Sequence, residues 1–458
     1  MRGRDTAGGF RSTRNFAGHV RCPHDSPVAE RLLDPPDGDA YASGMNSRIA
    51  VLPLAMLVLD ASAQEWTRFR GPNGSGVGKA GLPEQITEQN IHWRCKLPGS
   101  GHSSPVLWAD RIFVTATSDA SQAEKARRSV VCVDAKDGRI LWQKEFATGG
   151  YRHHGDNSFA SPSCAVDAER VYAWFAGTDE SVMVALSHAD GAEVWRSRLG
   201  PFKSQHGPGA SPVVEAGMVI LQSSQDDPGS FIGAFEPKTG KVVWKIALKG
   251  GRHSIATPCL AQGAGGKSQL LSLSSDNGLL GLDPATGEQA WALPDLFKLR
   301  VVASPVLMAG GLILAQSGEG QANSEITVVK GAAESKPGKA YDIVRTGGYV
   351  PTPIAVDDLI FLWKENGLVT CLRAATNEQL WSERVEGPYY SSPVCTGGKG
   401  GRIYNVTRGG EIVVIAAAEK FRLIQRFPLG ERNSYATPAL SGGRLFVRTF
   451  TQLIAIGK

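Results

Sequence analysis

Residues 281–291 read GLDPATGEQAW, and this pattern predicts a β-hairpin. Asp283 ends one strand, Pro284 fixes φ for the turn, and Gly287 supplies the position with φ > 0. Related copies begin near residues 133, 186, 235 and 372, and the last has Asn377 in place of glycine. The repeated positions are Gly138, Gly191, Gly240 and Gly287, with Trp93, Trp142, Trp195, Trp244, Trp291 and Trp381.

A second landmark, a small residue followed by Ser or Thr and then Pro, lies between these copies. It recurs at Ser104-Pro105, Ser161-Pro162, Ser211-Pro212, Thr257-Pro258, Ser304-Pro305, Thr352-Pro353, Ser392-Pro393 and Thr437-Pro438. A period of about 40–50 residues, filled with short strands and turns, is typical of a β-propeller. Eight landmarks predict an all-β fold with eight four-stranded blades.

The two ends of the repeat array each lack part of a blade. Trp93 lies ahead of the first Ser-Pro landmark, as an outer strand without inner strands before it, and residues 434–457 supply inner strands without a following Trp. We therefore expect the segment around Trp93 to complete the last blade beside residues 445–456. Such closure removes exposed sheet edges.

The tryptophan of each outer strand is expected to dock between neighbouring blades. The fifth and seventh blades have aliphatic residues near this position, at 343–344 and 423–424. We expect the junctions at these two blades to be weaker, because burial of an indole contributes a few kcal/mol, roughly.

The N-terminal residues have a different character. Residues 45–63 combine a short basic start, an apolar run and an Ala-Ser-Ala site before Gln64, which predicts a signal peptide. Because a signal peptide belongs at a true N-terminus, we interpret residues 1–44 as a gene-model extension or a disordered head. Residues 64–90 are expected to form an extended strap on the propeller at residues 91–458. The chain is therefore expected to be exported, to the periplasm or the extracellular space.

Composition excludes several classes of function. The net charge of +5 is diffuse, which argues against nucleic acid as a partner, and the apolar run of residues 49–59 is too short to span a membrane. The seven cysteines form no CxxC and no adjacent pair, so we interpret them as small buried hydrophobic residues. A monomer is expected.

The connections that lead into each Ser/Thr-Pro landmark are the candidate binding site. In a propeller these connections lie near the central axis, and here they are rich in His, Arg and Tyr. The candidate ligand-binding residues are His102, Arg152, His154, His206, Arg252, His253, Arg300, Tyr390 and Arg432. Acidic residues between the second and third strands, including Glu319 and Glu365, should share this face.

Three interpretations of this face stay open. It can be a polar channel mouth without a ligand, a pocket for a polar small molecule or protein partner, or a metal site of His102, His154, His206 and His253. Ligands from separate loops have no spacing that sequence can test, so we assign no metal. No Ser-His-Asp set, nucleophile elbow or paired-carboxylate motif is present, so catalytic residues are not assigned.

The D-x-x-T-G-x-x-x-W element with its Ser/Thr-Pro landmark resembles the pyrroloquinoline quinone (PQQ) repeat of quinoprotein-like eight-bladed propellers. The strap motif at 66–78 and the stretch at 99–106 are similar to secreted bacterial PQQ-like repeat proteins of undetermined activity. The superfamily also includes quinoprotein dehydrogenases and the propeller lipoprotein of the outer-membrane β-barrel assembly machinery. The chain lacks the adjacent cysteines of the dehydrogenases and a lipid-attachment Cys after residue 63.

Two functions follow from this resemblance. The leading one is an exported, non-catalytic propeller that binds a ligand or acts as a protein-interaction scaffold. The alternative is a quinoprotein-type oxidoreductase of the cell envelope, for which the resemblance implies PQQ and calcium as cofactors. Fold alone does not decide between them.

Overall fold

The computed structural model describes residues 66–458, except 80, 119–125, 148–149, 227–228, 321–322, 332–336 and 345. All described residues belong to one compact unit, Ala61–Lys458. The predicted N-terminal extension and signal peptide lie outside them. Among the described residues, no helix has the length and apolar character needed to cross a membrane.

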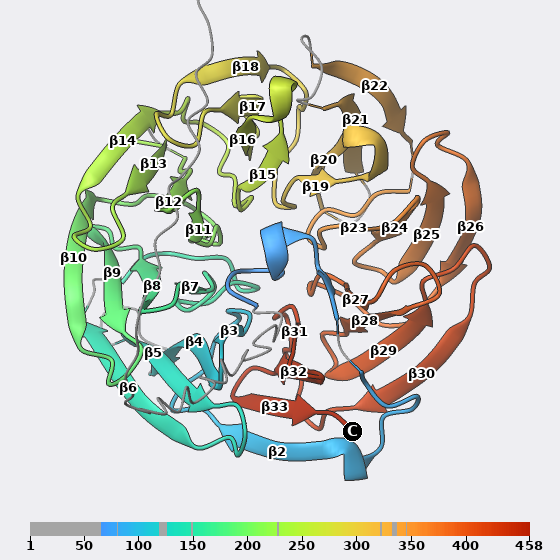
Figure 1. The fold of residues 1–458 in the computed structure, drawn as a ribbon, viewed down its shortest axis with the longest axis horizontal. Coiled ribbons are helices and arrows are strands. Elements are labelled where there is room, and N and C mark those ends of the chain that lie inside the picture. The colour runs from blue at the N-terminus through green and yellow to red at the C-terminus, as the bar shows by residue number, and fades with distance from the viewer. Residues whose placement is uncertain are drawn as a thin grey trace, which may run out of the picture. The chain divides into compact units, whose positions relative to one another are not determined.

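Eight β-sheets are arranged in a ring around a central axis (Figure 1). The first four blades consist of β3 (Val106–Trp108), β4 (Arg111–Ser118), β5 (Arg127–Asp134) and β6 (Ile140–Ala147); β7 (Ala165–Val166), β8 (Arg170–Phe175), β9 (Ser181–Ser187) and β10 (Glu193–Gly200); β11 (Val213–Glu215), β12 (Met218–Ser223), β13 (Phe231–Phe235) and β14 (Val242–Ala247); and β15 (Cys259–Gln262), β16 (Ser268–Ser274), β17 (Gly278–Leu282) and β18 (Gln289–Leu293).

The next three blades continue the ring in the same order of strands. They consist of β19 (Val306–Leu307), β20 (Leu312–Glu319), β21 (Asn323–Lys330) and β22 (Gly338–Ile343); β23 (Ile354–Val356), β24 (Leu359–Trp363), β25 (Leu368–Arg373) and β26 (Gln379–Arg384); and β27 (Val394–Thr396), β28 (Arg402–Val406), β29 (Glu411–Ala416) and β30 (Leu423–Pro428). Short 3-10 helices are η1 (Pro72–Gly74), η2 (Glu88–Asn90), η3 (Ala264–Gly266) and η4 (Ala309–Gly311).

The eighth blade joins the two ends of the propeller. It consists of β31 (Ala439–Ser441), β32 (Arg444–Arg448), β33 (Gln452–Ile456) and, as its outer strand, β2 (Ile91–Lys96). Strand β2 pairs antiparallel with β33, and Trp93 lies opposite Ala455. The predicted eight-bladed all-β fold, with terminal strands sharing the last blade, is confirmed.

Burial differs between the inner and outer strands for a geometric reason. The second strand of the first blade, β4, is buried along six of its eight residues because neighbouring blades cover both of its faces. The outer strand β2 instead alternates buried and exposed residues, because one of its faces lies at the rim.

The tryptophan of the repeat joins one blade to the next. Trp93 donates its indole N–H to the carbonyl oxygen of Ala135 in the first blade, at 3.1 Å. A Cβ atom at Gly138, where φ is 77°, would lie only 2.6 Å from this indole. The same contact pairs Trp142 with Gly191, Trp195 with Gly240 and Trp244 with Gly287. The repeat glycine therefore serves the turn and also the approach of the neighbouring tryptophan.

Both residues that were expected to replace tryptophan, in the fifth and seventh blades, are wrong. The outer strands carry a β-bulge, which places Tyr341 opposite Val328 in the fifth blade and Gln425 opposite Val414 in the seventh. The Tyr341 hydroxyl donates to the carbonyl oxygen of Ala374 in the next blade. Both positions therefore hold a hydrogen-bonding side chain, where the sequence predicts an aliphatic one.

Trp291, at the end of the fourth blade, departs from the docking pattern. Its indole N–H donates to Gln269 Oε1 in its own blade, at 2.7 Å. This indole hydrogen bond therefore stays within the fourth blade.

The Ser/Thr-Pro landmarks form a closed ring of hydrogen bonds around the axis. The backbone N–H of one serine or threonine in each blade donates to the side-chain hydroxyl of the corresponding residue in the next blade. The ring passes through Ser104, Ser163, Ser211, Thr257, Ser304, Thr352, Ser392 and Thr437 and then returns to Ser104. The donor–acceptor distances lie between 2.8 and 3.1 Å. We call these eight residues the hydroxyl ring. In the second blade Ser163 replaces the predicted Ser161, because the hydroxyl follows Pro162 there.

The described part of the strap, from residue 66, lies across one end of the central channel. In Figure 1 its helix η1 is the blue coil at the centre of the ring. The carbonyl oxygens of Trp66 and Thr67 accept N–H groups of the first two blades, and β1 (Val77–Gly78) pairs parallel with β27. Trp66 is fully buried, so it packs into the core as an extension of the propeller.

Two buried arginines of the strap reach the inner strands of other blades. Arg68 forms an ion pair with Glu215 at 2.8 Å, and Arg70 donates to the carbonyl oxygens of Thr352 and Pro353, each at 2.9 Å. The strap therefore ties together blades that are far apart in the sequence.

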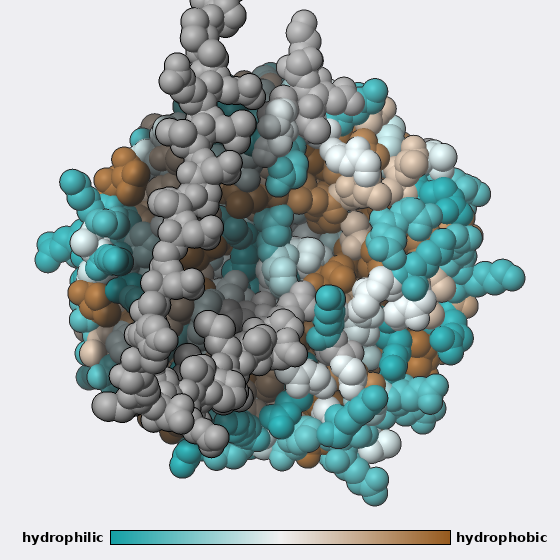
Figure 2. All heavy atoms as spheres, in the orientation of Figure 1, coloured by the Kyte–Doolittle hydropathy of each residue, from teal (hydrophilic) through white to brown (hydrophobic). Residues whose placement is uncertain are grey.

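The rim of the face shown in Figure 2 carries mainly hydrophilic side chains, with scattered hydrophobic ones. Among the described residues, the large hydrophobic side chains that are exposed are Ile140, Val194, Val242, Val243, Leu307, Val344 and Leu423, which belong to several different blades. Exposed apolar residues distributed in this way are normal for a soluble surface.

Candidate functional site

A cavity of about 450 Å³ lies at the other end of the central channel, and we call it the axial cavity. Its position relative to the strap follows from the order in which the residues of one connection meet the cavity, the hydroxyl ring and the strap. In the fourth blade Ile255 lines the cavity, Thr257 belongs to the hydroxyl ring, and Leu260 bonds to the strap. In the second blade Ser161 lines the cavity and Ser163 belongs to the ring. The hydroxyl ring therefore separates the strap from the axial cavity.

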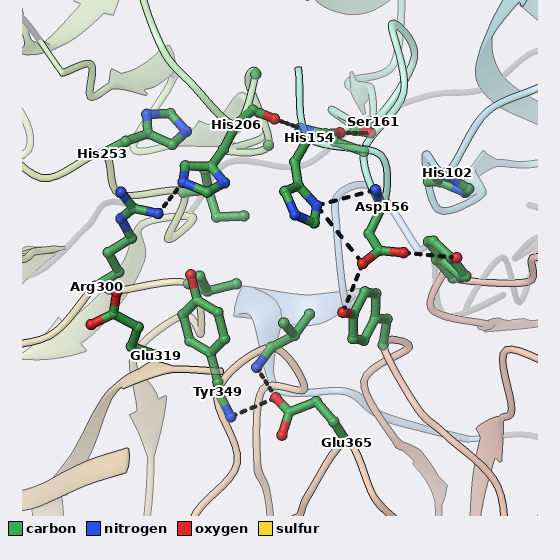
Figure 3. A pocket seen from close by; sticks show the side chains of 18 of the residues that line it. His102, His154, Asp156, Ser161, His206, His253, Arg300, Glu319, Tyr349 and Glu365 are labelled. Carbon is green, nitrogen blue, oxygen red and sulfur yellow. Dashed lines mark hydrogen bonds and ion pairs between the residues drawn. The ribbon is translucent and has the colours of Figure 1, made fainter. Parts of the chain in front are cut away.

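One side of the axial cavity is basic. His154, His206, His253 and Arg300 come from four successive connections between blades, and we call them the basic wall (Figure 3). An Arg300 guanidinium nitrogen is in contact with His206 Nε2. Because arginine is a donor only, His206 accepts this bond at Nε2, and its neutral form carries the proton on Nδ1.

The four groups of the basic wall lie close enough to influence one another. The rings of His154 and His206 are 5.6 Å apart, and those of His206 and His253 are 6.5 Å apart and nearly parallel. Burial lowers the pKa of His206, and the charges of Arg300 and His154 lower it further. The wall therefore combines a permanent cation, Arg300, with a neighbouring histidine, His206, that resists protonation.

His253 is the most buried member of the basic wall. Its side chain is 4% exposed, and its Nδ1 lies 2.7 Å from the carbonyl oxygen of Ser224. Its Nε2 has no hydrogen bond of good geometry, although the nearby backbone of Gly207 affects the pKa. Burial lowers the pKa of His253 to about 4, so the ring is neutral at pH 7.

On another side of the cavity, an acidic residue is paired with an arginine and two tyrosines. Asp156 forms an ion pair with Arg408 at 2.6 Å and accepts hydrogen bonds from the hydroxyls of Tyr390 and Tyr435. The guanidinium of Arg408 also lies over both tyrosine rings, at 4.5 and 4.8 Å from their centroids. The charge of Asp156 is therefore compensated within the protein.

His102 extends this cluster toward the first blade. Its ring stacks on Tyr435 with centroids 4.3 Å apart, and its Nδ1 is buried without a hydrogen-bond partner. Burial lowers its pKa to about 3, and the charge of Arg448 acts in the same direction. His102 is therefore neutral at pH 7 and contributes a flat ring to the cavity.

Glu365 is a buried acid that holds the backbone of the cavity in place. Its Oε1 accepts the N–H groups of Tyr349 and Val350, at 2.6 and 2.5 Å. Burial raises the pKa of Glu365, while the backbone hydrogen bonds partly offset this effect. The connection that carries Tyr349 is therefore positioned by a side chain from the next hairpin.

The structure brings together six of the nine predicted ligand-binding residues. His102, His154, His206, His253, Arg300 and Tyr390 line the axial cavity. The other three, Arg152, Arg252 and Arg432, are exposed and do not line it. Each of these arginines is exposed although a residue within three positions of it in the sequence lines the cavity.

Sequence reasoning missed Arg408 and gave no role to Asp156. Arg408 lies between β28 and β29, in the same type of loop as the acidic residues expected on this face. The sequence prediction for this face names only the acidic residues of these loops. Including the basic ones would have identified Arg408.

The described residues do not fit the cofactors of a quinoprotein dehydrogenase. The six described cysteines are free and buried, so none of them forms the vicinal disulfide implied by the resemblance. Asp156 is occupied by Arg408, and one oxygen of Glu365 by two backbone N–H groups. Within the described ranges, no three His, Cys, Asp or Glu side chains come together as metal ligands, and a calcium site needs six or more oxygens.

Comparison with known families and proteins gives a consistent result. A PQQ-type family model described as outer membrane protein assembly factor BamB matches residues 86–179, 178–333 and 327–423. The protein of that name from Yersinia pestis is 23% identical over 323 residues. This alignment covers 69% of the chain and 66% of the relative, just under two thirds of its length.

Solved structures share the fold. BamB from Moraxella catarrhalis superposes with a TM-score of 0.56 at 14% identity, covering 80% of this chain and 96% of that one. A quinohemoprotein alcohol dehydrogenase from Comamonas testosteroni gives the same TM-score and identity, covering 86% and 81%. The predicted resemblance to PQQ-like repeat propellers is confirmed, and these two likenesses concern the fold only.

Proposed function

Because the chain belongs to the family of PQQ-like repeat propellers described as outer membrane protein assembly factor BamB, we propose that it is an exported, non-catalytic binding propeller. Its partner, a polar small molecule or a polar group of a protein, enters the axial cavity. The observation that carries the proposal is the axial cavity itself, which described residues line at the end of the channel opposite the strap. The strap covers the opposite end of the channel, and the cavity presents polar side chains from several blades.

The hydrogen bonds of the cavity favour binding over catalysis. Ser161 is the serine hydroxyl that lines the cavity, and it donates to Asn157 Oδ1 rather than to a base. His154 Nδ1 accepts the backbone N–H of Asp156. A nucleophilic hydroxyl needs an adjacent base, and these contacts supply none.

The proposal is tested by what the exported protein retains. Wild-type protein is purified from its host and denatured, and the released molecules are identified by mass spectrometry. Val302 lines the cavity, so Val302→Trp should fill it and abolish retention. Val194→Trp, at an exposed rim position, is the matched control. Equal retention by the two variants would contradict the proposal.

Export has a separate test. The features of residues 45–63 support cleavage before Gln64. N-terminal sequencing of the exported protein should therefore begin at Gln64. An intact cytoplasmic chain that starts at Met1 would refute the export and the start-site proposals.

The oxidoreductase alternative rests on the shared fold. Its test is absorbance after incubation with PQQ and Ca²⁺, followed by a dye-linked oxidation assay. Stoichiometric binding with turnover would overturn the non-catalytic proposal, and we expect neither.

A further inference from the structure

The basic wall contains a cation that the protein does not compensate. Among the described residues, no carboxylate lies within 4 Å of the Arg300 guanidinium, whereas Arg408 is paired at 2.6 Å with Asp156, which lines the same cavity. Glu319 and Glu365 also line the cavity, but neither forms an ion pair with Arg300. Arg300 therefore offers charged donors to a molecule inside the cavity.

The neighbours of Arg300 favour the binding of an anion beside its guanidinium. Its charge lowers the pKa of His206 and acts against the burial that raises the pKa of Tyr349. A negative charge beside Arg300 would relieve the repulsion between Arg300 and a protonated His206. Anion binding should therefore raise the pKa of His206 and be accompanied by proton uptake below neutral pH.

The rest of the lining indicates the body of the ligand. Ile255, Val302 and Val350 supply apolar surface, and the rings of Tyr349, Tyr390 and Tyr435 supply flat surfaces. A volume of about 450 Å³ lies in the range of small-molecule sites. A single uncompensated guanidinium matches a single carboxylate, and flat rings favour stacking with a planar body.

From these contacts we propose that the axial cavity binds a small planar organic anion with one carboxylate, held by Arg300 and the basic wall. The proposal rests on the proposed function, because it assumes that the axial cavity is the binding site. It adds the chemical class of the ligand and the residue that selects it. Arg300 contacts the carboxylate, and the tyrosine rings contact the planar body.

The test compares two probes that differ in charge. Benzoate and its neutral isostere benzamide are titrated into the purified full chain by isothermal calorimetry at pH 7. Benzoate should bind about tenfold more tightly or better, as expected for a charge-assisted contact. Repeating the titration near pH 6 in buffers of different ionisation enthalpy should reveal proton uptake with benzoate alone.

Two variants assign the effect to Arg300. Arg300→Gln should reduce benzoate affinity about tenfold or more and leave benzamide unchanged. Arg252→Gln, an exposed position outside the cavity, should match the wild type. Thermal unfolding checks that each variant is folded.

Each other outcome has a defined meaning. Equal affinity for benzoate and benzamide, or full benzoate affinity in Arg300→Gln, would overturn the proposal and leave the cavity as a binding site for neutral ligands. Competition by inorganic phosphate as strong as by benzoate would overturn the planar-body part. If neither benzoate nor benzamide binds, the proposed ligand class is overturned. The proposed function is tested separately, by the retention of ligand in Val302→Trp.

Discussion

The two ends of the central channel use arginine in opposite ways. At the strap end, Arg70 is fully buried and donates to four carbonyl oxygens, those of Gly74, Ser75, Thr352 and Pro353. At the cavity end, Arg300 is half-buried and contacts one histidine nitrogen. A guanidinium surrounded by carbonyls stabilises a fold, whereas one with free donors is available to a ligand. Replacing the arginine is therefore expected to lower the free energy of unfolding at the strap end and the ligand affinity at the cavity end.

The largest effect is expected at the strap end. Arg70→Met would leave two buried and two partly buried carbonyl oxygens without this donor, so we expect a loss of roughly 3–5 kcal/mol in the free energy of unfolding. Urea denaturation measures it, with exposed Arg252→Met as the control. A loss below about 1 kcal/mol would mean that the strap does not hold the blades together.

Acid should destabilise the cavity end. The pKa of His253 is about 4 in the folded protein and about 6.5 when unfolded, so the unfolded state binds more protons between these values. Stability should therefore fall as the pH drops from 6.5 to 4, by roughly 3 kcal/mol from this residue.

His253→Gln should flatten this pH dependence. His92→Gln, at an exposed position of β2, should leave it unchanged. The charges of Asp226 and His206 also affect the pKa of His253. The test therefore compares the pH dependence of stability between variants, because the curve of one protein does not isolate His253. An equal slope in wild type and His253→Gln would show that His253 is not a buried neutral ring.

The hydroxyl ring between the two ends should give an intermediate effect. Thr257→Val keeps the shape of the side chain but removes the acceptor of the Ser211 N–H, which is buried. We expect a loss of about 1–3 kcal/mol. Thr257→Ser retains the hydroxyl and should recover most of it. Equal stability of the Val and Ser variants would mean that the ring contributes through packing alone.

The smallest effect on stability is expected at Arg300. Arg300→Gln removes an uncompensated, half-buried cation next to His206, so the free energy of unfolding should change by about 0–1 kcal/mol. A loss comparable to that of Arg70→Met would make Arg300 a structural residue.

The fold was predictable because the repeat is local. The turn, the glycine and the tryptophan lie within about ten residues, and their chemistry determines a hairpin whatever surrounds it. Errors arose where a local shift changed the position of a side chain. A β-bulge brought Tyr341 and Gln425 into the tryptophan positions, and in the second blade the ring hydroxyl lies after its proline, at Ser163.

The site was predictable only in part, because its contacts are long-range. Connections near the axis could be identified from the repeat, and six candidate residues line the cavity. The direction of each side chain could not be inferred, as the exposed Arg252 beside the buried His253 illustrates. The pair Asp156–Arg408 spans 252 residues, and no spacing in the sequence indicates it.

The most direct test of the contrast between the two ends applies two assays to Arg70→Met and Arg300→Gln. Urea unfolding and benzoate affinity are measured on both proteins under conditions where both are folded. We predict that Arg70→Met loses stability and keeps its benzoate affinity, whereas Arg300→Gln keeps its stability and loses affinity. Stability and affinity that fall together in both variants would contradict the separation of scaffold and site.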